Sequence, residues 1–218
     1  MKTFFITGTD TDCGKTYVTC QLLNHLHRFK KKAFAIKPVA SGGLQQNGQL
    51  ISEDVINLQK YNQHLACPVN GWTFSSPISP HLAAREEGST LTIKEIAAFC
   101  FDESYASLDY LLIEGAGGLL VPLNEKETWL DFLSLSKVPV VLVVGMRLGC
   151  INHALLTASV LHHYGLPSLG WIANCLDKNM LALEENIATL VDRMPMPLIG
   201  TVPHEGAFVS HSLILENL

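Results

Sequence analysis

The fold of this chain is set by one stretch, Gly8-Thr9-Asp10-Thr11-Asp12-Cys13-Gly14-Lys15-Thr16. A short apolar segment at Thr3–Thr7 leads directly into it. Behind it, the segment Lys15–Phe29 carries apolar residues at helical spacing. A glycine-bearing loop between a strand and a helix is the setting in which a backbone curls around phosphate groups. The sequence therefore predicts a phosphate-binding loop over residues 8–16.

The chemistry of this loop follows from its residue types. Glycines allow a tight curl in which backbone N–H groups converge on phosphate oxygens, and the helix N-terminus adds partial positive charge. Lys15 can reach the β and γ phosphates, and Thr16 can offer its hydroxyl to Mg²⁺. The usual pattern has four residues between the first glycine and Gly-Lys-Thr, whereas this chain has five. The extra residue indicates a variant subgroup of phosphate loops.

Strand-like and helix-like segments alternate along the chain, which predicts an α/β fold of the P-loop NTP hydrolase type. We expect a mostly parallel sheet flanked by helices on both faces, in a single domain over residues 1–218. The expected strands are Thr3–Thr7, Ala33–Pro38, Tyr110–Glu114, Val138–Gly145, Leu169–Asn174 and Leu198–Val202. The expected helices are Lys15–Phe29, Ser52–Lys60, Thr92–Cys100, Asn152–Tyr164 and Glu184–Arg193. The Gln- and Gly-bearing stretch Gly42–Gln49 is expected to be a loop.

Composition narrows the class of protein. The 218 residues are 48% apolar and 16% charged, which suits a sizeable buried core. A formal net charge of -5 gives no reason to expect nucleic acid or an anionic membrane surface as a partner. The apolar runs are too short for a signal-peptide core or a membrane span, so we expect a cytoplasmic protein. The six cysteines lack C-x-x-C spacing and are expected to be free thiols.

Three further residues suit a phosphoryl-transfer site. Glu114 ends an apolar strand before a glycine-rich turn, where it can hold magnesium, although a solvated Glu in such a turn is the alternative. Lys37 closes the second strand, near the expected ligand crevice, unless it is an edge lysine in water. Asp54 can complete the metal shell or can serve only as a helix-capping acid.

At this point the sequence resembles the dethiobiotin synthetases over roughly residues 3–205, and the five-residue spacing of the phosphate loop is part of the resemblance. The matching segments are Gly8–Thr16, Lys37-Pro38-Val39-Ala40-Ser41-Gly42, Ser79-Pro80-His81, Glu114-Gly115-Ala116-Gly117-Gly118, Gly149-Cys150-Ile151-Asn152-His153-Ala154 and Ala173-Asn174. The resemblance implies a P-loop α/β homodimer that joins CO₂ to 7,8-diaminopelargonate with ATP and Mg²⁺. A carbamate forms first, its oxygen is phosphorylated to a mixed anhydride, and the second amine then closes a cyclic urea.

The resemblance also implies roles for individual residues. Lys15 and Lys37 would stabilise the charge of the transferring phosphoryl group. Magnesium would be held by Thr16, Asp54 and Glu114. The nucleotide would contact Asp12, Cys13, Gly14, Lys15, Thr16, Tyr17, Asp54, Glu114, Gly115, Ala116, Gly117, Asn174, Pro203, His204 and Glu205. The substrate would contact Thr11 and Ser41, and its tail carboxylate would be bound across the dimer interface by Gly149, Cys150, Ile151 and Asn152. Without the resemblance, this last segment reads as an ordinary helix start with a buried Cys150.

Base recognition departs from the family pattern. An acid often follows the position of Asn174, but Cys175 stands there in this chain. A thiol is a poor acceptor for an exocyclic amine. We therefore expect GTP or another nucleoside triphosphate to be accepted alongside ATP.

Two other classes of protein share parts of this pattern. ATPase switches of the partitioning type use the same scaffold, but they usually carry an additional lysine early in the loop, where this chain has Thr9-Asp10. Small-molecule kinases usually bring an arginine-rich lid, and no arginine cluster is visible in the sequence. The product separates the readings, because a kinase leaves a stable phosphorylated compound and a ligase leaves free phosphate and a cyclic urea.

Overall fold

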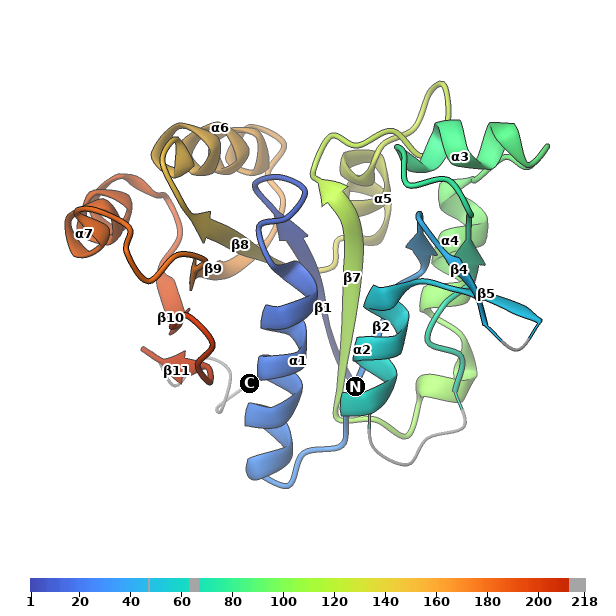
Figure 1. The fold of residues 1–218 in the computed structure, drawn as a ribbon, viewed down its shortest axis with the longest axis horizontal. Helices are drawn as coiled ribbons and strands as arrows, with labels where there is room; N and C mark the ends of the chain where they lie inside the picture. The colour runs from blue at the N-terminus through green and yellow to red at the C-terminus, as the bar shows by residue number, and fades with distance from the viewer. Residues whose placement is uncertain (47, 63–66, 212–218) are drawn as a thin grey trace.

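The computed structural model describes residues 1–46, 48–62 and 67–211, within which seven strands form the main sheet (Figure 1). Their spatial order is β11-β10-β9-β8-β1-β7-β2. The strands are β1 (Lys2–Gly8), β2 (Ala33–Ile36), β7 (Tyr110–Gly118), β8 (Val140–Met146), β9 (Ser168–Cys175), β10 (Leu198–Val202) and β11 (Val209–Ser210). Every neighbouring pair is parallel except β10 and β11. The prediction of a mostly parallel sheet is confirmed.

Helices cover both faces of the sheet. They are α1 (Lys15–Arg28), α2 (Glu53–Tyr61), α3 (Pro80–Glu86), α4 (Ile93–Cys100), α5 (Trp129–Ser136), α6 (Cys150–His163) and α7 (Leu183–Arg193). In Figure 1, α1 and α2 lie side by side in front of the sheet, and α5 lies behind β7. None of the described helices is both long enough and apolar enough to cross a membrane.

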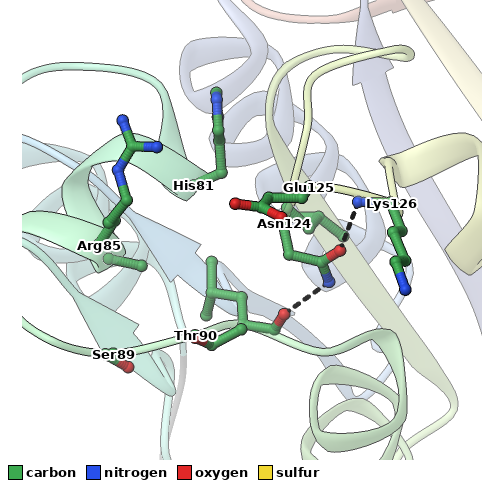
Figure 2. A pocket seen from close by; sticks show the side chains of 10 residues that line it. His81, Arg85, Ser89, Thr90, Asn124, Glu125 and Lys126 are labelled. Carbon is green, nitrogen blue, oxygen red and sulfur yellow. Dashed lines mark hydrogen bonds between the residues drawn. The ribbon is translucent and has the colours of Figure 1, made fainter.

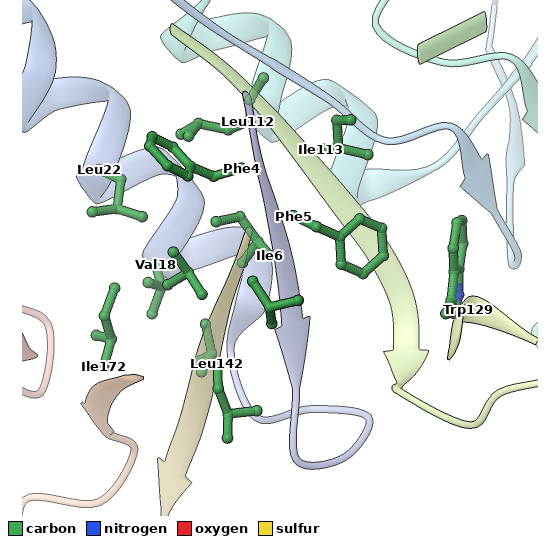
Figure 3. Close-up of a cluster of buried hydrophobic side chains, with 14 of the residues drawn as sticks. Phe4, Phe5, Ile6, Val18, Leu22, Leu112, Ile113, Trp129, Leu142 and Ile172 are labelled. Carbon is green, nitrogen blue, oxygen red and sulfur yellow. The ribbon is translucent and has the colours of Figure 1, made fainter. Parts of the chain in front are cut away.

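Side chains of β1 alternate between the two layers of the core. Phe4 and Ile6 point toward α1, where Val18 and Leu22 lie, whereas Phe5 points the other way (Figure 3). The Phe5 ring packs 5.3 Å from that of Trp129 in α5. A strand buried on both faces is what a continuous apolar run in a parallel sheet predicts. The phosphate loop therefore follows a strand that is buried from Phe4 to Gly8.

The structure corrects one predicted segment and adds others. The loop expected at Gly42–Gln49 contains a two-stranded antiparallel hairpin, β4 (Leu44–Gln46) and β5 (Gln49–Ile51). Helices α3 and α5 had not been predicted, and neither had the short parallel pair β3 (Val39–Ala40) and β6 (Trp72–Thr73).

The parallel sheet brings several chain segments to one edge. The carboxyl ends of β1, β2, β7, β8 and β9 lead into Thr9, Lys37, Leu119, Arg147 and Leu176. Because parallel strands end on the same side of the sheet, loops from distant parts of the sequence meet there.

Candidate functional site

The loop between β1 and α1 turns through two residues with positive φ. Gly14 has φ 83° and precedes the first residue of α1, and Asp12 has φ 57°. The left-handed region is uncommon for a residue with a side chain and recurs at ligand-binding loops. The backbone thus wraps around a small cavity in front of the N-terminus of α1.

Lys15 folds back over this loop. Its Nζ atom lies 2.9 Å from the carbonyl oxygen of Asp10, to which it donates a hydrogen bond. The residue is only 6% exposed. Lys15 also lines the cavity in front of α1, where a phosphate chain would lie.

Four side chains from distant segments form one polar cluster beside the loop. Lys37 Nζ lies 2.8 Å from Asp54 Oδ2 and 2.7 Å from Glu114 Oε1. The Thr16 hydroxyl lies 2.8 Å from Asp54 Oδ1 and 2.6 Å from Glu114 Oε1. Since the hydroxyl has a single proton, it donates to one carboxylate at a time. The structure thus brings Thr16, Lys37, Asp54 and Glu114 together.

The cluster holds opposite charges in their ionised forms. Burial alone would lower the pKa of Lys37, but the Glu114 and Asp54 carboxylates outweigh it and raise that pKa above its usual value. Burial alone would raise the pKa of Asp54. The Lys37 ammonium and the hydrogen bond from Thr16 outweigh burial and lower that pKa below its usual value. Lys37 is consequently a permanent cation at neutral pH.

The same cluster fits a magnesium ion. Glu114 is fully buried, and its Oε2 atom has no hydrogen-bond partner in the described part of the chain. A buried carboxylate oxygen without a partner is costly unless a cation or another ligand completes it. No group of three or more His, Cys, Asp or Glu side chains that could hold a metal occurs in the described residues. A magnesium ion here would therefore combine few protein oxygens with phosphate oxygens and water, as it does in phosphate-loop sites.

Two cavities meet at the phosphate loop. The first has about 200 Å³ and is lined by Thr11, Asp12, Gly14, Lys15, Thr16, Lys37, Asp54 and Gly117. The second has about 330 Å³ and is lined by Thr9, Asp10, Thr11, Gly118, Leu119, Leu120, Val121, Leu156, Thr157 and Val160. Thr11 belongs to both linings. A polar, charged cavity thus borders a mainly apolar groove.

A larger cavity of about 390 Å³ shares no lining residue with these two. It lies between α3 and the segments 89–91 and 123–126 (Figure 2). Arg85 and Lys126 contribute positive charge and Glu125 negative charge. The Asn124 amide donates to the Leu91 carbonyl and so holds two loops together. His81, from the matching segment Ser79-Pro80-His81, lines this cavity, whereas no residue of the phosphate loop does.

The glycine-rich turn expected after Glu114 is wrong, because β7 continues to Gly118. The residues after Glu114 lie partly at the cavity and partly in the core. Gly117 has φ 67° and lines the polar cavity. A Cβ atom at Gly115 would lie 2.7 Å from the Phe5 ring, so the glycine is needed for packing. The Ala116 carbonyl accepts a hydrogen bond from the Trp129 indole at 3.0 Å.

The residues expected to contact the nucleobase lie beside the phosphate loop and the first turn of α1. Asn174 is 3% exposed, and its Nδ2 donates to the Cys13 carbonyl at 2.9 Å. The Tyr17 hydroxyl donates to the Gly206 carbonyl at 2.9 Å. The segment 203–206 therefore lies against the first turn of α1, with Pro203, His204 and Glu205 exposed beside it.

The residues expected at the substrate are less closely gathered. The Ser41 hydroxyl is buried without a hydrogen-bond partner among the described residues. The four residues Gly149–Asn152 open α6, and none of them lines the polar cavity or the apolar groove. Gly149 has φ 94°, and Cys150 is 2% exposed.

An ion pair that the sequence did not predict lies across the phosphate loop. Arg147 lies 2.6 Å from Asp10 Oδ2, and both side chains are partly exposed. Arg147 directly follows β8, at the sheet edge where ligands bind. Glu114 was predicted as a site residue because it ends an apolar run, and Arg147 also follows one. The same pattern could therefore have indicated Arg147.

Comparison with known proteins places the chain among enzymes. Residues 2–212 match the family described as AAA domain. A protein of Legionella pneumophila (strain Corby), named ATP-dependent dethiobiotin synthetase BioD, is 50% identical over 206 residues, covering 94% of this chain and 95% of that protein. A protein of the same name from Cellvibrio japonicus (strain Ueda107) is 46% identical over 93% of this chain and 89% of its own length.

Solved structures with a similar fold are more distant in sequence. The MinC:MinD cell division protein complex of Aquifex aeolicus has a TM-score of 0.55 at 14% identity and covers 94% of this chain and 82% of its own. The cell division protein FtsY of Thermotoga maritima has a TM-score of 0.54 at 14% identity, with 98% and 66% covered. These likenesses confirm the P-loop fold alone. High identity over nearly full length shows the family, and the chain belongs to the ATP-dependent dethiobiotin synthetases.

Proposed function

We propose that the chain joins 7,8-diaminopelargonate and CO₂ and closes them into dethiobiotin with ATP and Mg²⁺. We further propose that the chain is a single domain and that it works in the cytoplasm, where ATP is supplied. The observation that carries the proposal is the shared wall at Thr11, where a polar cavity with two lysines borders an apolar groove. A substrate with two amines at one end and an aliphatic chain fits this pairing of surfaces. The family of the chain supports the same reaction.

The reaction balances in three steps. One amine of the substrate attacks CO₂ and loses a proton, which gives a carbamate. A carbamate oxygen then attacks the γ phosphorus, the bond to the β-phosphate oxygen breaks, and ADP leaves. The second amine attacks the carbonyl carbon of the mixed anhydride, loses its proton and expels phosphate, which closes the cyclic urea.

The lysines act through charge and position. Lys37 is buried and cationic, and Lys15 lies at the rim of the loop. Phosphoryl transfer offers little covalent chemistry for a protein to perform, so preorganised cations that meet the developing charge supply most of the catalysis. We assign both lysines to this role.

Thr16, Asp54 and Glu114 would hold the magnesium ion, which supplies charge neutralisation at the phosphates when bound. Their oxygens converge within hydrogen-bond distance of one another, and the unpartnered Glu114 Oε2 favours a cation there. The ammonium of Lys37 occupies the space between the two carboxylates. Lys37, beside both carboxylates, would add its positive charge next to such an ion and stabilise the transferring phosphoryl group.

A second copy of the chain would complete the substrate site. The segment Gly149–Asn152 lies outside both cavities of its own chain, so it would serve the partner's groove, with its backbone N–H groups binding the tail carboxylate. Two large apolar side chains that line the groove are exposed, which supports a covering partner. Leu120 is 55% exposed and Leu156 is 60% exposed. Thr11 and Ser41 would bind the diamine or its carbamate.

The nucleotide would lie along the loop. The triphosphate would contact Asp12–Thr16, and the base would lie between Asn174 and the segment 203–205, close to Tyr17. The contact of Tyr17 with Gly206 supports this, because it fixes that segment beside the loop.

Oxygen transfer tests the proposal. Turnover with ¹⁸O-bicarbonate should place one ¹⁸O in the released phosphate and leave one in the cyclic urea, both read by mass spectrometry. Phosphate without label would show that water, and not a carbamate, attacks ATP. That result would favour the ATPase-switch alternative.

A further inference from the structure

The buried side chain of Asn174 contacts the phosphate loop from the sheet. Asn174 stands near the carboxyl end of β9 and is 3% exposed. Its amide lies 2.9 Å from the carbonyl oxygen of Cys13, which is itself buried within the loop. A carbonyl oxygen only accepts, so the group that faces it is the Asn174 NH₂. The hydrogen bond joins residues 161 positions apart in the sequence.

The packing around this bond leaves the loop little freedom. A Cβ atom at Gly14 would collide with Nδ2 of Asn174. One at Gly145, in β8, would lie 2.9 Å from the Cα atom of Cys13. The loop therefore rests directly on the ends of β8 and β9, with Asn174 as the hydrogen-bonding part of that support.

Because the peptide bond is planar, the contact with the Cys13 carbonyl also sets the direction of the next N–H group, that of Gly14. In a planar trans peptide the C=O and the following N–H point in opposite directions. Asn174 holds the Cys13 carbonyl toward the sheet, which turns the Gly14 N–H away from it. Gly14 lines the polar cavity, so this N–H is directed to the place of the phosphates.

We propose that Asn174 is a positioning residue for the phosphate loop, acting through the Cys13–Gly14 peptide, and that this role is separate from contact with the base. The proposal rests on phosphate binding at this loop. A base contact would use the Oδ1 atom of Asn174, which is not the atom that holds the loop. One amide would then link the two ends of the nucleotide.

A ligand without a base separates the two roles. We suggest titration calorimetry of the full chain with magnesium tripolyphosphate and with a non-hydrolysable magnesium ATP analogue. Asn174→Ala is expected to weaken both ligands about tenfold, the scale of leaving one buried carbonyl without its donor. The control Ile172→Val removes one buried methylene from the same strand and is expected to bind both ligands as the unchanged chain does.

Each outcome decides the matter. If Asn174→Ala weakens the ATP analogue but binds tripolyphosphate normally, Asn174 is a base contact alone and the inference is wrong. If the unchanged chain binds neither ligand, the proposed nucleotide site fails as well. Amide hydrogen exchange on the folded variant gives a second readout, because faster exchange at Gly14 and Lys15 is expected only if Asn174 orders the loop.

Discussion

Replacing Lys37 by methionine tests the charged cluster on which the site depends. The substitution keeps most of the apolar stem and removes the ammonium, which leaves Asp54 and Glu114 facing each other without a cation. Removing one partner of a buried ion pair typically costs about 3–5 kcal/mol. The Asp54 side chain is 43% exposed and screened by solvent, so the lower end applies. We expect the free energy of unfolding in urea, without Mg²⁺, to fall by about 3 kcal/mol.

Magnesium should reverse part of this loss, because a divalent cation can take the place of the ammonium between the carboxylates. Turnover should nevertheless fall about a hundredfold or more, the scale of losing one transition-state donor. Lys60→Met, at an exposed lysine, is the matched control and should change neither quantity. A Lys37→Met variant as stable as this control, or with unchanged turnover, would refute the reasoning.

Further substitutions and assays examine other parts of the site. Glu114→Gln should raise the Mg²⁺ concentration needed for half-maximal activity, and an unchanged requirement would move the metal elsewhere. Because Cys175 stands where an acidic acceptor is often found, kcat/KM for ATP and GTP should be comparable; a hundredfold preference for ATP would contradict this. Five of the six cysteines are buried, and burial raises the pKa of Cys20 to about 12, so a thiol reagent at pH 8 should modify Cys67 first in the native protein. Rapid modification of Cys20 would show that the packing around α1 is looser than described.

Much of the fold could be read from local patterns. Strands β1 and β8 are buried and so appear in the sequence as apolar runs. Helix α1 is buried on one face and so appears as apolar residues at helical spacing. The hairpin β4–β5 was missed because all three residues of β4 are exposed, so no apolar alternation marks it. Helix α5 was missed because its apolar residues surround most of the helix, although Thr128 and Asp131 form a capping box that could have revealed it.

The site was partly accessible for a different reason. Phosphate binding needs a contiguous motif, so the loop Gly8–Thr16 could be recognised from the sequence alone. The pairing of Lys37 with Asp54 and Glu114 depends on strands brought together by the sheet, and sequence spacing cannot show such contacts. The Arg147–Asp10 pair and the hold of Asn174 on the loop are likewise properties of the tertiary structure.

The central claim is that phosphoryl transfer from ATP is coupled to closure of the cyclic urea. The most direct measurement is ADP release with Mg²⁺ and bicarbonate, with and without 7,8-diaminopelargonate, together with the mass of the product. The account predicts that ADP release requires the diamine and equals the amount of dethiobiotin formed. ADP release at the same rate without the diamine, or with it but without the cyclic urea, would contradict the account.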